Sequence, residues 1–230
     1  MKKKIVILTG AGMSAESGIK TFRDAGGLWE GHDVMEVASP EGWHKNKELV
    51  LDFYNQRRKQ LKEVEPNAAH LALPELEKDY KVVIITQNVD NLHERAGSSN
   101  VIHLHGELTK VRSTRNHNLV YEKLGDINLG DNCEEGSQLR PHIVWFGEAV
   151  PLMDSAIKEV SDAHVIIIIG TSMQVYPAAG LVSYAARDAS IYYIDPKPSI
   201  NFELSTSKNL KVFSEKASTG VRKVVDELKK

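Results

Sequence analysis

The sequence predicts an α/β fold, a Rossmann-like, doubly wound parallel sheet that carries a small inserted domain. Four short runs rich in β-branched residues are apolar throughout, as expected of strands that are covered on both faces. Helical patterns alternate with these runs, which is typical of open parallel sheets. The predicted strands are residues 5–8, 82–85, 165–169 and 191–194. The predicted helices are residues 67–78, 153–161, 177–187 and 219–228.

Two stretches depart from this alternation. Residues 21–65 begin as a Gly-rich loop and end in a long amphipathic helix, whereas residues 108–140 are polar and have little core-forming periodicity. We expect both stretches to form a small domain within a single catalytic core, with a ligand cleft at the carboxyl ends of the strands. The large domain then comprises about residues 1–20, 66–107 and 141–230, and the small domain about residues 21–65 and 108–140.

Composition narrows the class of protein. The 230 residues are enough for one well-buried core, and the net charge of −2 argues against a general nucleic-acid-binding protein. No apolar stretch reaches the length of a membrane span, so we expect no membrane association. The single cysteine, Cys133, fits a reducing, cytoplasmic location.

A glycine-containing turn after the first predicted strand is typical of nucleotide sites. Gly10 permits a tight turn, Gly12 allows a pyrophosphate to approach the backbone, and Ala15 is small enough for close helix packing. A turn that serves only packing is the alternative. An ordinary dehydrogenase would carry an acidic residue at a strand end about twenty positions later. Here that region is a loop, in which Arg23 could reach a phosphate and Phe22 could cover a ring.

Further motifs follow in an order that resembles one family. In sequence they are residues 10–19 (GAGMSAESGI), 21–23 (TFR), 87–90 (QNVD), 103–107 (HLHGE), 146–148 (FGE) and 170–172 (GTS). Together they resemble the sirtuins, the Sir2 family of NAD-dependent protein lysine deacylases, over most of the chain. The resemblance implies that NAD is a co-substrate and that acylated lysine side chains of proteins are the partners.

The resemblance also implies the chemistry. The acyl oxygen of the lysine attacks C1′ of the nicotinamide ribose, and His105 acts as general base so that the 2′-oxygen attacks the resulting centre. The products are nicotinamide, deacylated lysine and 2′-O-acyl-ADP-ribose. Asn88 and Asp90 line the nicotinamide pocket, and His103 supports the site. From the residues alone, His105 could instead be a strand-end histidine that hydrogen-bonds a loop, and Asn88 and Asp90 could simply turn the chain.

The remaining site residues follow from the same resemblance. The expected NAD contacts are Gly10, Ala11, Gly12, Ala15, Ile19, Phe22, Arg23, Trp29, Gln87, Asn88, Asp90, Gly170, Thr171, Ser172, Asp195 and Ala217. The expected peptide contacts, through strand addition, are Val144, Phe146, Gly147 and Glu148. Asp195 stands where many relatives have Asn.

Two features distinguish this chain within the family. Sirtuins usually hold zinc through two Cys-x-x-Cys pairs, but residues 108–140 offer only Cys133 and His117, so we predict no zinc. Tyr54 and Arg57 are three residues apart on one helix face and resemble the acyl-carboxylate receptor of class III sirtuins.

Class III sirtuins remove succinyl and malonyl groups, and Ala25 matches their roomier pocket. We therefore predict a preference for acidic acyl-lysines, with acetyl-lysine also accepted. An amphipathic helix with Arg57 and Arg58 in solvent is the structural alternative. For the function, the alternatives are a protein ADP-ribosyltransferase that uses the same site and a non-catalytic sensor of NAD or ADP-ribose.

Overall fold

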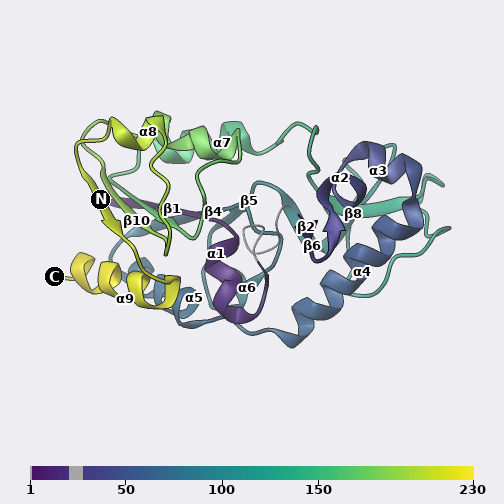
Figure 1. Ribbon diagram of the computed structural model, residues 1–230, viewed down its shortest axis with the longest axis horizontal. Coiled ribbons are helices and arrows are strands. Elements are labelled where there is room, and N and C mark those ends of the chain that lie inside the picture. Colours follow the sequence, from purple (N-terminus) through teal and green to yellow (C-terminus); the bar gives the residue numbers. More distant parts are fainter. Residues whose placement is uncertain (1, 21–27) are drawn as a thin grey trace.

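The sheet at the centre of the larger part of the molecule is parallel and six-stranded (Figure 1). The computed structural model describes residues 2–20 and 28–230. The strands are β1 (Lys4–Thr9), β4 (Lys81–Thr86), β5 (Val101–His103), β9 (Val165–Ile169), β10 (Ser190–Ile194) and β11 (Leu210–Phe213). Their spatial order is β5-β4-β1-β9-β10-β11. Counted along the chain this is 3-2-1-4-5-6, the doubly wound order, so the predicted fold class is confirmed.

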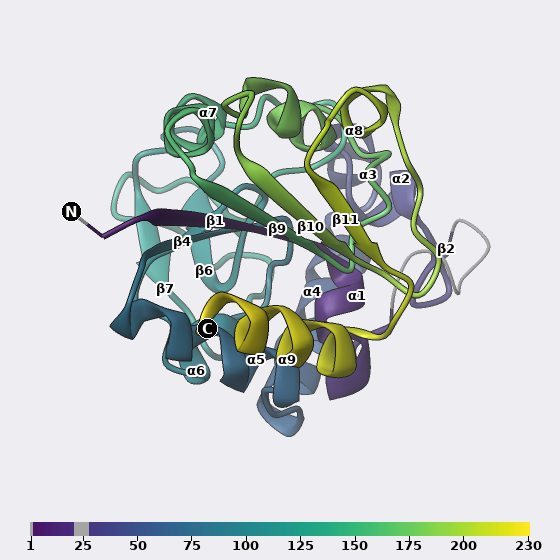
Figure 2. The same cartoon turned by 90° about the vertical axis from the view of Figure 1, so that its left-hand side faces the viewer.

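Helices cover both faces of this sheet, as Figure 2 shows. Successive side chains of a strand point to opposite faces of the sheet, so both faces of β1 are apolar. Ile5 and Ile7 belong to one core cluster, and Val6 and Leu8 belong to another. The first face packs against α5 (Ala68–Ala72), the 3₁₀ segment η3 (Leu73–Lys78) and α9 (Ala217–Leu228). The second face packs against α7 (Met153–Ser161), the 3₁₀ segment η4 (Ala178–Tyr184) and α8 (Phe202–Ser205).

The predicted helix at residues 67–78 is only partly α-helical. Asn67 caps α5 by accepting hydrogen bonds from the backbone N–H groups of Ala69 and His70. Pro74 then begins the change to η3, because proline has no N–H to donate to the preceding helical turn. The strand β11 was not predicted, since its four residues are all at least partly exposed and carry no continuous apolar signal. No helix in the described part of the chain is long and apolar enough to cross a membrane.

A second group of elements packs beside the carboxyl edge of the large sheet (Figure 1). It contains an antiparallel three-stranded sheet and a hairpin, and Phe53, Tyr54 and Trp145 lie in its core. The strands are β2 (Leu28–Trp29), β3 (His32–Asp33), β6 (Gly106–Ser113), β7 (Val120–Glu122) and β8 (Leu139–Ile143). The helices are α2 (Val34–Val37), α3 (Pro40–Lys45) and α4 (Lys47–Glu63).

The division into two domains remains a proposal. Strand β8 pairs with β6 and spans the boundary that we placed between residues 140 and 141. The segment 108–140 also contains more core than its composition suggested, because Val111 and Ile127 are almost fully buried. The apolar residues of this segment are too widely spaced in the sequence to give a periodic signal. Only the packing of the folded segment, including β6, against α4 brings them together.

Candidate active site

Two glycine loops meet where the chain order of the sheet reverses, between β1 and β9. The Gly12 N–H donates to the Gly170 carbonyl at 2.8 Å, and a Cβ at Gly12 would lie 2.7 Å from the Gly170 Cα atom. Gly170 has a φ of 59° and would place a Cβ 2.3 Å from the Met13 nitrogen. A Cβ at Gly10 would likewise lie 2.8 Å from the Thr171 Cβ atom, so the glycines are required for packing, and the expected approach of a pyrophosphate to Gly12 stays a prediction. A dinucleotide would bind at this crossing in the general pattern of open α/β sheets.

A buried polar chain connects this loop to the end of β4. The Ser14 hydroxyl donates to Asp90 Oδ2 at 2.9 Å and accepts from Asn88 Nδ2 at 3.0 Å. The Leu92 N–H donates to Asp90 Oδ1 at 3.1 Å. Burial raises the pKa of Asp90, and the hydrogen bonds from the Leu92 N–H and Ser14 oppose that rise. The structure thus brings Asn88 and Asp90 together with Ser14, a residue of the 10–19 motif for which we had predicted no role.

His105 lies in the turn after β5, with its ring against the Gln87 backbone. Its Nδ1 lies 3.1 Å from the Gln87 carbonyl oxygen. A carbonyl only accepts, so Nδ1 carries the proton and Nε2 keeps a free lone pair. The Gln87 side chain donates from Nε2 to the Thr171 hydroxyl at 3.1 Å. The residue whose carbonyl holds the His105 ring is therefore also bound to the loop after β9. The half-buried ring has the tautomer that a general base requires.

The pH dependence of catalysis follows from this environment. Burial lowers the pKa of His105 below its ordinary value of 6.5, and the hydrogen bond to Gln87 opposes the shift. A general base works when neutral, so activity is lost as the pH falls through the folded-state pKa. We expect the acid limb of the kcat/KM profile to have its midpoint below pH 6.5. A midpoint above that value, measured with an acyl peptide at saturating NAD, would contradict this assignment.

His103 has a different state from His105. Its Nδ1 lies 3.2 Å from the Asn88 carbonyl oxygen and its Nε2 lies 2.7 Å from Glu94 Oε1, so both nitrogens donate. Burial alone would lower the pKa of His103, but the hydrogen bond and charge of Glu94 raise it. The imidazolium holds the Asn88 backbone, which agrees with the supporting role expected for it. Glu94 carried no signal in the sequence, because it lies nine residues before its partner.

The residues expected at the adenosine half gather at the ends of β9 and β10. Thr171 is buried and its carbonyl accepts from the Tyr193 hydroxyl at 2.9 Å, and Ser172 follows it in the loop. Asp195 is buried, and its carboxylate accepts from the Lys197 N–H at 2.8 Å. Ala217 begins α9, next to Ser218.

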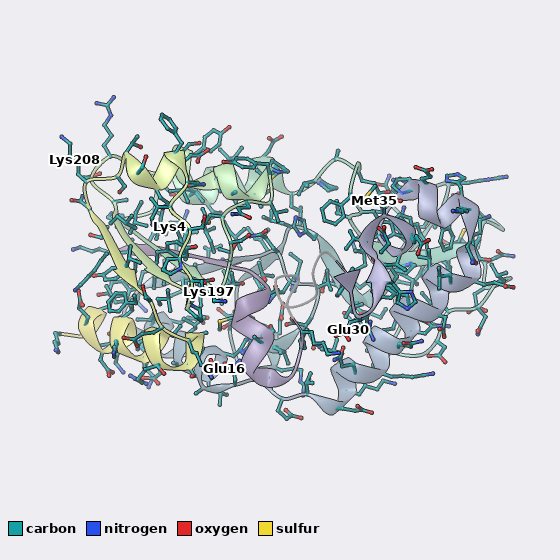
Figure 3. The ribbon with its side chains drawn as sticks, viewed as in Figure 1. Lys4, Glu16, Glu30, Met35, Lys197 and Lys208 are labelled. Carbon is teal, nitrogen blue, oxygen red and sulfur yellow. The ribbon has the colours of Figure 1, made fainter. Side chains whose placement is uncertain are left out.

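The amino end of α9 is fixed to the nucleotide loop. Glu16, labelled in Figure 3, accepts from the Ser218 N–H at 2.9 Å and from its hydroxyl at 2.8 Å. This contact places Ala217 beside α1 (Ala11–Ser14) and the 3₁₀ turn η1 (Ala15–Ser17). Ala11 therefore lies on α1, which contacts the β9 loop, and Ala15 lies on η1, which contacts α9.

Tyr54 and Arg57 share a face of α4 but do not form the predicted joint receptor. The Tyr54 side chain is fully buried, and its hydroxyl accepts from Trp145 Nε1 at 3.0 Å. Arg57 instead lines a small cavity; its Nε and Nη1 atoms are buried and have no hydrogen-bond partner among the described residues. The other residues that line this cavity are Ile19, Trp29, Glu30, Gln60, Leu61, Val89, Asp90 and Leu108.

This cavity joins the expected nicotinamide residues to an arginine. Burial lowers the pKa of Arg57, and the negative charge of Glu30 opposes the shift. Glu30, labelled in Figure 3, also pairs with Lys20 at 3.2 Å. Trp29 packs edge-on against Phe53 and Tyr54. The structural alternative, both arginines in solvent, is wrong, because Arg58 is only 3% exposed.

The segment expected to pair with a substrate peptide is largely satisfied internally. The N–H groups of Val144 and Phe146 donate to the carbonyls of His105 and Ala38, and that of Glu148 donates to the Trp145 carbonyl. Gly147, with a φ of 90°, has open space where a Cβ would be. Phe146 is 46% exposed. Strand addition here would therefore use carbonyl groups, the Gly147 N–H and the Phe146 side chain.

The Glu148 carboxylate is held by hydrogen bonds from other groups of the same chain. It accepts from Arg140 at 2.7 Å, from Arg112 at 3.2 Å and from the Trp145 N–H at 2.8 Å. These bonds lower the pKa of Glu148 against the effect of burial. The Glu148 side chain therefore has a structural role, since a buried Arg pair needs a countercharge, and the expected backbone pairing of this segment with a peptide stays a prediction. Three further expected site residues, Phe22, Arg23 and Ala25, lie outside the described residues.

The cysteine pairs that usually hold zinc in the family have no counterpart in residues 108–140, because Cys133 is the single cysteine. Cys133 is buried, and its Sγ lies 3.1 Å from the Ser137 hydroxyl. Among the described residues, no three His, Cys, Asp or Glu side chains lie close enough together to bind a metal. The two Cys-x-x-Cys pairs of the family cannot be assembled from one cysteine. We expect metal analysis of the purified protein to find a zinc content well below about one ion per chain. A stoichiometric zinc ion whose removal by chelators unfolds the protein would contradict this prediction.

Comparisons with known proteins give a consistent assignment. Residues 10–177 match the model of the Sir2 family. A curated NAD-dependent protein deacylase of Helicobacter pylori is 70% identical over 195 residues, which cover 85% of each chain. A crystal structure of a Sir2 homologue with NAD is 42% identical, with a TM-score of 0.87 over 99% of this chain and 90% of the other. A Sir2 homologue variant bound to 2′-O-acetyl ADP ribose is 41% identical, with a TM-score of 0.87 over 99% and 92%. This chain belongs to the Sir2 family.

Proposed function

We propose that the chain is an NAD-dependent protein lysine deacylase that transfers the acyl group to ADP-ribose. The observation that carries this proposal is the 3.1 Å contact between His105 Nδ1 and the Gln87 carbonyl oxygen, because it leaves Nε2 as the nitrogen that can act as a base. A non-catalytic sensor of NAD would have no use for an imidazole held as a base. The relatives named as deacylases and the homologue with 2′-O-acetyl ADP ribose support the same reaction.

In the proposed reaction the Asp90 carboxylate and the Asn88 amide hold the nicotinamide carboxamide. The acyl oxygen of the lysine attacks C1′ of the ribose, and the bond to nicotinamide breaks. His105 then takes a proton from the ribose hydroxyls, so that the 2′-oxygen attacks the acyl carbon. Water completes the release of the lysine amine and of 2′-O-acyl-ADP-ribose. The described residues supply a base and a buried polar pocket for these steps.

The proposed acyl preference rests on Arg57. Its guanidinium lies in a cavity that also contains Asp90, and two of its nitrogens have no partner among the described residues. A half-buried guanidinium with two N–H-bearing nitrogens free of acceptors favours an anionic ligand, and a succinyl or malonyl terminus supplies a carboxylate. The negative charge of Glu30 weakens the attraction between Arg57 and an anionic acyl group. We therefore propose that acetyl-lysine is also accepted. Tyr54 contributes by fixing Trp145 and Trp29 rather than by touching the acyl group.

Transfer of ADP-ribose to a protein is the competing reaction, because both begin by breaking the nicotinamide bond. The two differ in product mass. We expect mass spectrometry of succinyl, malonyl and acetyl peptides incubated with NAD to show free peptide and acyl-ADP-ribose. Peptide or protein that gains the mass of ADP-ribose, with no acyl-ADP-ribose, would overturn the proposal in favour of the transferase.

A further inference from the structure

A second cavity, of about 270 Å³, shares only Leu61 with the lining of the acyl cavity and contains none of the residues expected to contact NAD. It is enclosed by α4, by α6 (Leu92–Arg95) and by the β6–β7 region. The residues that line it are Arg58, Leu61, Lys62, Asn91, Arg95, Thr109, Lys123 and Leu124. Four of these eight side chains are cationic and none is acidic, so the cavity has the charge of an anion site.

Arg58 is the deepest cation of this cavity. It is 3% exposed, and its Nη1 donates to Asn55 Oδ1 at 3.1 Å. Its Nε and Nη2 atoms are buried without a hydrogen-bond partner in the described part of the protein. Burial lowers the pKa of Arg58 to about 10, and the charge of Asp126 opposes the shift, so the group remains a cation at neutral pH. Buried guanidinium N–H groups without acceptors are costly, which indicates a missing acceptor.

The rim residues add charge around Arg58. Arg95 pairs with Glu65 at 2.7 Å and Lys123 with Asp131 at 3.8 Å. Glu65 is mostly exposed, so that countercharge is screened by water. The Asn91 Oδ1 atom is also buried without a partner among the described residues. It is an acceptor, and therefore suits a ligand that carries a hydroxyl group beside its anionic group.

We propose that this cavity binds a small phosphate-bearing molecule, with its phosphate oxygens on Arg58, Lys62 and Lys123 and a hydroxyl group donating to Asn91. The comparison with the acyl cavity favours phosphate over carboxylate. That cavity has one arginine beside two carboxylates, whereas this one has four cations and no carboxylate in its lining. A dianion with three acceptor oxygens satisfies more of these donors than a carboxylate does.

The site also adjoins the catalytic loop. Asn91 follows Asp90 directly and begins α6, whose first N–H donates to the Asp90 carboxylate. An experiment must therefore keep the NAD site filled, because its pyrophosphate region would bind phosphate as well. Binding at this second cavity requires no turnover, so its test is independent of the proposed deacylase activity.

The test is isothermal titration calorimetry of the protein saturated with ADP-ribose, with inorganic phosphate in one arm and glycerol 3-phosphate in the other. Ionic strength is matched with chloride. We expect saturable binding of one phosphate compound per chain. The double variant Lys62→Gln, Lys123→Gln is expected to weaken it by about 10-fold or more. Lys59→Gln, which removes an exposed charge from the same helix outside the cavity, is the matched control and is expected to bind like the wild type.

The two arms separate the sources of the phosphate group. Tighter binding of glycerol 3-phosphate supports a phosphate ester whose hydroxyl reaches Asn91, and equal binding supports phosphate itself. Arg58→Met is expected to abolish binding while the protein still unfolds cooperatively, since methionine removes the unpaired N–H groups. The proposal is overturned if neither compound binds saturably to the wild type, or if the double variant binds as tightly as Lys59→Gln.

Discussion

Replacement of His105 with alanine is expected to lower kcat/KM for deacylation by about 10²–10⁴-fold. The variant removes the imidazole that contacts the Gln87 carbonyl through Nδ1 and that we propose as the general base. The loss should lie in kcat, because the one hydrogen bond of this ring to the described residues is that to the Gln87 carbonyl. Initial rates of acyl-ADP-ribose formation, measured by mass spectrometry, test this expectation.

A matched control is His44→Ala, which removes an exposed histidine whose ring contacts the carbonyl of Pro40 in its own helix. That variant should retain wild-type rates. Equal thermal unfolding midpoints for both variants would show that the loss is chemical rather than structural. Deacylation by His105→Ala at more than about a tenth of the wild-type rate would contradict the assignment of His105 as the general base.

Replacement of Arg57 with methionine should change which acyl group is preferred. Desuccinylation is expected to fall by about 10–100-fold in kcat/KM, because the acyl carboxylate loses a charge-assisted hydrogen bond of about 1.5–3 kcal/mol. Deacetylation should stay within about two-fold, since an acetyl group ends in a methyl that needs no cation. The measurement is the ratio of kcat/KM for succinyl and acetyl versions of one peptide.

Two further variants sharpen this prediction. Arg57→Lys keeps the charge but not the planar fork, and should lie between the wild type and Arg57→Met. Lys59→Met removes an exposed cation from the same helix and should leave the ratio unchanged. An equal fall for both acyl groups in Arg57→Met would mean that Arg57 supports the cavity or NAD rather than the acyl terminus.

Much of the fold could be read from the chain because its signals are local. Continuous β-branched runs occur only where a strand is covered on both faces, and four of the six strands of the large sheet were identified from them. The remaining two, β5 and β11, have three and four residues and are not fully buried, so they give weaker signals. The loops after these strands had to meet at one edge, since parallel strands all end on the same side. The position of His105 follows from the same rule.

The sequence by itself determined the fold class, four strands of the sheet and the glycine loops, because each depends on neighbours within a few positions. Only the tertiary structure decided which partner each polar group meets. Tyr54 turns to Trp145, 91 residues away in the chain, and Arg58 is buried in a cavity rather than solvated. Helical spacing fixes the face on which a side chain lies, but packing between distant segments fixes what it touches.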